Sequence, residues 1–217
     1  MSESRATGLS PARTADARAQ ETRGSALLEL IASDVQAWTD LGFLGSSPRR
    51  AAPFAALRLA WTFSGFRATL LYRLSHALYR ARVRGLPGIV AAYNIALHGL
   101  DIPPFVPIGP RLYIPHPVGT VVSARRIGSG ATLVSAVTIG MRNEAAFPLI
   151  GDNVYIGAGG RVLGGIVVGN DVAIGANAVV LTDVPDGSVA VGVPATVRPR
   201  PAVRPPGGRS DEHNADR

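Results

Sequence analysis

An aliphatic residue recurs at every sixth position through most of the second half of the chain. Three runs carry this period: Ile102, Ile108 and Ile114; then Val121, Ile127, Leu133 and Ile139; then Ile150, Ile156, Val162, Val168, Ile174 and Val180. A helix repeats every 3.6 residues and a strand every two, so neither produces the period alone. It is typical of a parallel β-helix, in which each short strand ends at a corner and its aliphatic side chain points into the coil. The pattern predicts such a coil over residues 100–198.

Residues 25–99 have instead the apolar spacing of amphipathic helices. Leucines and aromatic residues recur at this spacing over Leu27–Val35 and Leu57–Leu78, and a third helix is predicted from Pro87 to Leu97. Ser46–Pro48 marks a break between helices. The chain is therefore expected to be mainly β, with an α-helical region at its N-terminal side.

The two ends of the chain lack apolar periodicity. Residues 1–24 are rich in Ser, Ala, Arg and Thr, and residues 199–217 are rich in Pro and Gly. Such segments cannot bury enough apolar surface to offset the entropy of ordering, so both are predicted to be disordered.

Two places interrupt the six-residue period. One extra residue is needed between Ile114 and Val121, in a corner that contains His116, and Met141–Pro148 must leave the coil as a loop. Function tends to lie where a regular solenoid departs from its repeat. We therefore interpret the corner and the loop as parts of a functional site.

Composition narrows the chemistry. The chain of 217 residues has no cysteine, which excludes disulfides, cysteine-ligated zinc and a cysteine acyl-enzyme. Its net charge is +7 and every cation is an arginine, which suits a polyanionic cofactor such as coenzyme A. Few aromatic residues lie among the arginines, which argues against a nucleic-acid surface.

The apolar runs of the chain bear on where in the cell the protein is expected. They are too short to span a bilayer, and no basic region followed by an apolar core begins the chain. A cytoplasmic protein with no membrane span is expected.

Asp101 and His116 form the candidate catalytic pair. Moving an acetyl group from a thioester to a hydroxyl requires removal of the hydroxyl proton, and a histidine with a pKa near 6.5 suits that role. A carboxylate would fix the histidine tautomer and stabilise the imidazolium. The fifteen-residue interval is close to one turn of a coil whose turns stack about 4.8 Å apart. We expect direct attack by the acceptor hydroxyl, with no acetyl-enzyme.

Several segments together resemble the serine acetyltransferase family of hexapeptide-repeat acyltransferases. The helical segment Phe66–His76, the start of the coil at Asp101–Pro104 and the segment Pro115–Gly119 match the family's pattern, as do Ser135–Gly140 and Gly192–Ala195. The helical segment and the interval from Asp101 to His116 are the more specific matches.

The resemblance implies a left-handed β-helix, a homotrimer and an acetyl-CoA-dependent O-acetyltransferase without a metal. Acetyl-CoA would lie in the groove between adjacent subunits, with its pantetheine arm passing Gly140, Ala158 and Ala176. Arg198, just past the end of the coil, would meet a phosphate of the cofactor.

The chain departs from the family where the acceptor binds. The family's catalytic histidine follows an aspartate and its loop carries an arginine-histidine pair before a proline; here the matching residues are Pro115, Ala146 and Phe147. These residues offer no charge for a zwitterion, whereas Phe147 can stack on a sugar ring and Arg142 can bind hydroxyls or a phosphate. The preferred acceptor is therefore a sugar or another small hydroxylated molecule, as in the colanic-acid type of exopolysaccharide enzymes, which the shortened loop also resembles.

Two other functions stay open. The first is a serine O-acetyltransferase of cysteine biosynthesis with a rearranged serine site, and the second is a non-catalytic scaffold with the same coil. A carbonic anhydrase on this coil would need three histidines around zinc. The coil contains only His116, which excludes that function.

Overall fold

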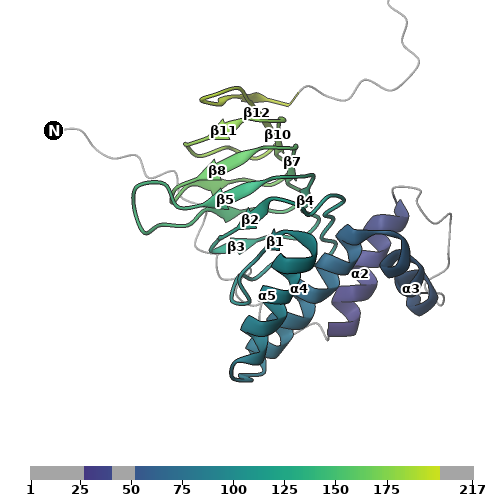
Figure 1. Cartoon of the computed structure of the whole chain (residues 1–217). Coiled ribbons are helices and arrows are strands. Elements are labelled where there is room, and N and C mark those ends of the chain that lie inside the picture. The colour runs from purple at the N-terminus through teal and green to yellow at the C-terminus, as the bar shows by residue number, and fades with distance from the viewer. Residues whose placement is uncertain (1–26, 41–51, 201–217) are drawn as a thin grey trace, which may run out of the picture.

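The computed structural model describes residues 27–40 and 52–200, and places a group of helices at one end of a long β-coil (Figure 1). The helices are α2 (Leu27–Asp40), α3 (Ala52–Thr62), α4 (Ser64–Arg80) and α5 (Leu86–His98). The expected break at Ser46–Pro48 lies outside the described residues. So do the two terminal segments that are predicted to be disordered, except for residues 199 and 200.

The helix predicted from Pro87 to Leu97 is confirmed as α5, one residue longer at each end. The apolar run Leu57–Leu78 is instead divided between α3 and α4, because Phe63 has an extended backbone (φ −117°, ψ 119°). Its ring packs against Trp38 of α2 at a centroid distance of 5.0 Å. The contact lies at the bend between α3 and α4, which the apolar spacing alone did not predict.

The coil winds through three parallel sheets. Sheet A has the order β1-β2-β5-β8-β11, sheet B has β3-β6-β9, and sheet C has β13-β12-β10-β7-β4. All pairs are parallel except β12 with β13, an antiparallel pair at the end far from the helices (Figure 1). The strands are β1 (Leu100–Asp101), β2 (Thr120–Val122), β3 (Arg126–Ile127), β4 (Thr132–Leu133), β5 (Thr138–Gly140), β6 (Leu149–Ile150), β7 (Tyr155–Ile156), β8 (Arg161–Leu163), β9 (Val167–Val168), β10 (Ala173–Ile174), β11 (Val179–Val180), β12 (Ser188–Val191) and β13 (Thr196–Pro199).

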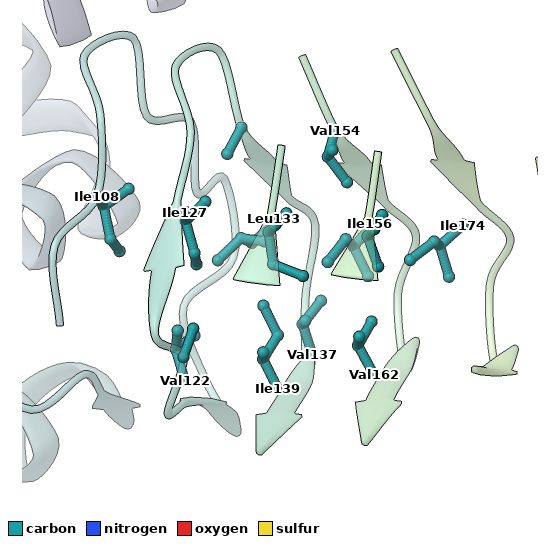
Figure 2. Close-up of a cluster of buried hydrophobic side chains, with 14 of the residues drawn as sticks. Ile108, Val122, Ile127, Leu133, Val137, Ile139, Val154, Ile156, Val162 and Ile174 are labelled. Carbon is teal, nitrogen blue, oxygen red and sulfur yellow. The ribbon is translucent and has the colours of Figure 1, made fainter. Parts of the chain in front are cut away.

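Aliphatic side chains stack along the inside of the coil, turn upon turn (Figure 2). Ile127, Ile150 and Val168 form one such column, because their strands pair in register. Of the residues with six-residue spacing, all are buried in this core except Val121.

Val121 corrects the predicted register. It is 39% exposed, whereas its neighbour Val122 is fully buried. The ladder pairs Val122 with inward-facing Ile139 and leaves Val121 opposite Thr138, on the outer face. Eight residues separate Ile114 from Val122, where six separate Leu133 from Ile139. The corner at His116 therefore contains two extra residues rather than one.

A buried ion pair fastens the helices to the coil. Nε and Nη2 of Arg73 donate to the two carboxylate oxygens of Asp34 at 2.8 and 3.0 Å. The same guanidinium donates to the carbonyls of Ile108 and Gly109, both at 2.7 Å, and Leu112 N–H donates to Asp34 at 2.8 Å. Burial acts to lower the pKa of Arg73, but the charge and hydrogen bonds of Asp34 outweigh it and the pKa is raised.

Helix α4 makes two further bonds to the first turn of the coil. Tyr72 donates its hydroxyl to Val106 O at 2.7 Å, and His76 Nδ1 lies 2.8 Å from Pro104 O. Ala68 and Tyr72 belong to the same apolar cluster as the coil core. Helix α4 thus closes the first end of the coil and fixes how the helices sit on it.

Candidate active site

His116 lies in the widened corner that leads from the sheet C face into β2. Its side chain is exposed, and its backbone N–H donates to Val134 O of the next turn at 3.2 Å. Gly119, with a φ of +73°, ends the corner and donates to Gly99 O at 3.1 Å. The two extra residues therefore present an accessible imidazole on an anchored backbone.

Helix α4 supports this corner from the side. A Cβ built at Gly65 would overlap the carbonyl oxygen of Ile114 and lie only 2.7 Å from that of Pro115. The first turn of α4 therefore packs directly against the residue before His116. Only glycine allows the two backbones to approach so closely.

Asp101 lies on β1, half-buried on the outer face of sheet A. It pairs with Val121, twenty residues later, so the fifteen-residue interval to His116 is shorter than a full turn. Within the described ranges, no hydrogen bond or ion pair joins Asp101 to His116. The bond between Gly119 and Gly99 nevertheless holds the histidine corner beside the residues just before Asp101.

Ala158 and Ala176 share the histidine's edge of the coil. Gly159 N donates to Ser135 O and Asn177 N to Ala158 O, both at 2.8 Å, which stacks the corners of successive turns. Both alanines are exposed, and Ser135 is half-buried.

The loop Met141–Pro148 leaves the opposite edge of sheet A, after Gly140. It lies over the following turn, since a Cβ built at Gly165 would come within 2.8 Å of the Ala146 Cβ. Phe147 is half-buried and Arg142 is exposed. All strands of sheet A run the same way, so His116 stands at their beginning and this loop at their end.

The other predicted residues are spread out. Gly140 lies at the base of the loop, with open space where its side chain would be. Arg198 lies on β13 opposite Val189, exposed at the far end of the coil. Within one chain, the structure brings His116, Ala158 and Ala176 to one edge and leaves Gly140, Arg142 and Phe147 at the other.

Neither a metal site nor a membrane span is found in residues 27–40 and 52–200. This part of the chain has no group of three or more metal-ligating His, Asp or Glu side chains. None of its helices is both long and apolar enough to cross a bilayer.

A parallel β-helix with a histidine in a widened corner and small exposed residues along the same edge defines a hexapeptide-repeat acyltransferase. Comparison with known proteins makes this more specific, although no protein-family model matches the chain. The serine acetyltransferase of Helicobacter pylori strain J99 is 41% identical over 137 residues, which are 61% of this chain and 80% of that protein. That of Mycobacterium tuberculosis is 40% identical over 151 residues, 68% of this chain and 66% of that protein. The chain belongs to the serine acetyltransferase family.

Solved structures agree. The crystal structure of Neisseria gonorrhoeae serine acetyltransferase superposes with a TM-score of 0.70 at 28% identity, covering 83% of this chain and 69% of that one. A serine acetyltransferase in complex with CoA superposes with a TM-score of 0.69 at 29% identity, covering 86% and 75%. The family's coil is a left-handed parallel β-helix, as the sequence resemblance implied.

The preference for a sugar acceptor was only partly right. The relatives confirm an acyltransferase that transfers an acetyl group, but they are serine acetyltransferases and so favour the serine O-acetyltransferase alternative. The lack of charge at Pro115, Ala146 and Phe147 had suggested otherwise. That interpretation considered only the residues at the family's motif positions. It left out residues of neighbouring turns, such as Arg125, whose backbone is bonded to Pro148 at the end of the loop.

Proposed function

We propose that this protein transfers the acetyl group of acetyl-CoA to the hydroxyl of L-serine. The observation that carries the proposal is the exposed His116 in its widened corner, on a coil that belongs to the serine acetyltransferase family. Acetyl-CoA is the donor. The chain has no cysteine and His116 can activate the acceptor hydroxyl itself, so we expect direct attack without a covalent acetyl-enzyme.

His116 is the general base in this mechanism. It takes the proton from the serine hydroxyl as the oxygen attacks the thioester carbonyl, and it later returns that proton to the thiolate. Asp101 stabilises the imidazolium. The two are not hydrogen-bonded here, and bonds of this kind often tighten only when substrates bind.

The edge formed by Ala158 and Ala176 fits the pantetheine arm of the donor. Small side chains at a corner leave backbone N–H and C=O groups accessible to a ligand, and both alanines are exposed beyond His116. The thioester at the end of the arm supplies the activated acetyl group. Gly140 and Arg198 complete the proposed groove, Gly140 from the loop side and Arg198 toward the CoA phosphates.

The two halves of the site point to a closed ring of chains. His116 begins the strands of sheet A and the loop Met141–Pro148 ends them, so one chain alone does not bring them together. In a ring, one edge of each subunit meets the other edge of the next. A homotrimer would place the loop of one chain, with Pro148, Phe147 and Arg142, against His116 of its neighbour.

Thiol release from acetyl-CoA tests the proposal, with L-serine, L-homoserine, a set of sugars and nucleotide sugars as acceptors. We expect turnover with L-serine well above the rest. Turnover with a sugar and none with serine would favour an enzyme of the exopolysaccharide type, to which Phe147 and the shortened loop point. No release with any acceptor would favour a scaffold. The cytoplasmic location stays a prediction.

A further inference from the structure

The proposed acceptor requires a cation near the end of the loop that rejoins the coil, whereas Arg142, the arginine of the loop, lies at its start. L-Serine has a carboxylate, and burying it without a partner costs much free energy. Pro115, Ala146 and Phe147 have no charge. The following inference rests on the proposed function, and asks which cation of this chain binds that carboxylate.

Four arginines of the described residues already have a structural role. Arg73 is paired with Asp34, and Arg111 with Asp40. Arg67 donates to the carbonyls of Ala60 and Trp61 at the end of α3, and Arg161 donates to Gly159 O. These four are not available to a substrate without loss of a bond within the fold.

Arg125 stands apart from this group. Its backbone N–H donates to Pro148 O at 2.9 Å, which places it directly beneath the point where the loop rejoins the coil. Its side chain is exposed, whereas Ala124 on one side and Ile127 beyond are buried. Among the residues that the structure describes, no ion pair involves Arg125.

Two neighbouring arginines are placed differently. Arg126 is half-buried on β3 and pairs with Leu149 of β6. Because its neighbour Ile127 faces the core, Arg126 lies on the outer face of sheet B. Arg142 lies at the start of the loop, near Gly164 of the next turn. Both add positive charge around the loop, but only Arg125 is joined by its backbone to the residue that follows Phe147.

We propose that Arg125 binds the carboxylate of the acceptor and so determines that the enzyme accepts an amino acid. The guanidinium presents parallel N–H donors that match a carboxylate, and charge-assisted bonds of this kind are strong and directional. In the proposed ring, Arg125 and the loop of one subunit face His116 of the next.

The test compares L-serine with L-serinamide, which keeps the hydroxyl and the ammonium but has a neutral amide in place of the carboxylate. In Arg125→Gln, kcat/KM for L-serine should fall roughly 10- to 100-fold, mainly through KM, as expected for loss of a charge-assisted bond. kcat/KM for L-serinamide should be unchanged. Arg125→Lys should restore part of the activity with serine.

Arg58→Gln is the matched control, because it removes the same charge from an exposed site on α3. It should affect neither substrate. Equal losses with both substrates in Arg125→Gln, or full activity with serine, would overturn the inference while serine acetylation by the wild-type enzyme stands. A wild-type enzyme that acetylates neither substrate would overturn the proposed function and this inference with it.

Discussion

Two histidines illustrate how position within the same fold leads to different roles. His116 is exposed in a corner that the repeat does not require, and no structural hydrogen bond engages its ring in the described residues. His76 is half-buried where α4 meets the coil, and its Nδ1 lies 2.8 Å from Pro104 O. The first is available for proton transfer, whereas the second holds two parts of the molecule together.

Replacement of His116 by alanine should lower kcat by about 10²- to 10⁴-fold, the usual contribution of a general base. Thermal unfolding should be nearly unchanged, because the side chain is exposed and its backbone bond to Val134 remains. Steady-state thiol release measures the first effect and calorimetry the second. An unchanged kcat would contradict the assignment of the base.

His76 should make the fold sensitive to mild acid. Burial is the largest cause that lowers its pKa, the charges of Arg73 and Arg80 lower it further, and the bond to Pro104 opposes them. As pH falls below 6.5, the unfolded chain binds a proton that the folded chain does not yet bind. Stability is therefore complete above that pH and declines below it.

Urea unfolding at pH 7.5 and pH 5.5 measures this effect, with His76→Gln as the comparison. The wild type should lose more stability on acidification than the variant. His98, whose pKa burial also lowers, is present in both proteins, so its contribution cancels. An equal loss of stability in the two proteins would show that His76 does not cause the sensitivity to acid.

At the scale of elements, the helices and the coil are joined mainly through one face of α4. Gly65 packs on the backbone before His116, and Arg73 reaches both Asp34 of α2 and the carbonyls of the first coil turn. At one column of corners, side-chain oxygens also accept hydrogen bonds from the backbone of the neighbouring turn. Asp152 Oδ1 accepts from Ser129 N, and Asn170 Oδ1 accepts from Asp152 N, so successive turns are connected by a ladder.

Replacement of Arg73 by alanine should destabilise the protein by about 3–5 kcal/mol, because it leaves Asp34 buried without its partner. A double replacement, Asp34→Leu with Arg73→Met, should cost clearly less, since no buried charge remains. Chemical denaturation of the three proteins gives the comparison. A double variant at least as unstable as Arg73→Ala would mean that the ion pair is not the main link.

At the scale of the whole molecule, the histidine and the exposed alanines lie at one edge of the coil, and the loop between β5 and β6, with Arg125 beneath it, lies at the other. The coil keeps the two sides apart, so the proposed site requires the homotrimer that we propose. The helices cover the end of the coil next to the histidine corner and leave the far end to β12 and β13.

Ala158→Trp should raise the dissociation constant of CoA about tenfold or more, since a large side chain would fill the proposed groove and a tenfold change requires only about 1.4 kcal/mol. Ala81→Trp, at an exposed position after α4, is the control and should leave CoA affinity unchanged. Titration calorimetry with CoA measures both. Equal effects of the two substitutions would remove Ala158 from the groove.

The sequence by itself determined the coil, since an inward-facing position must be aliphatic in every strand and this requirement repeats at a fixed spacing. It also singled out His116, because a regular repeat makes an insertion visible. It misplaced Val121, because the ladder with β1 and β5, not the count along the chain, decides which residue faces inward.

Only the tertiary structure paired Asp34 with Arg73, packed Gly65 on Pro115 and placed Arg125 under Pro148. Each of these contacts joins residues more than twenty positions apart, so no local pattern records it. The same holds for the charge at the acceptor site. Pro115, Ala146 and Phe147 have no charge, and only the winding of the coil brings Arg125 of the preceding turn next to the end of the loop.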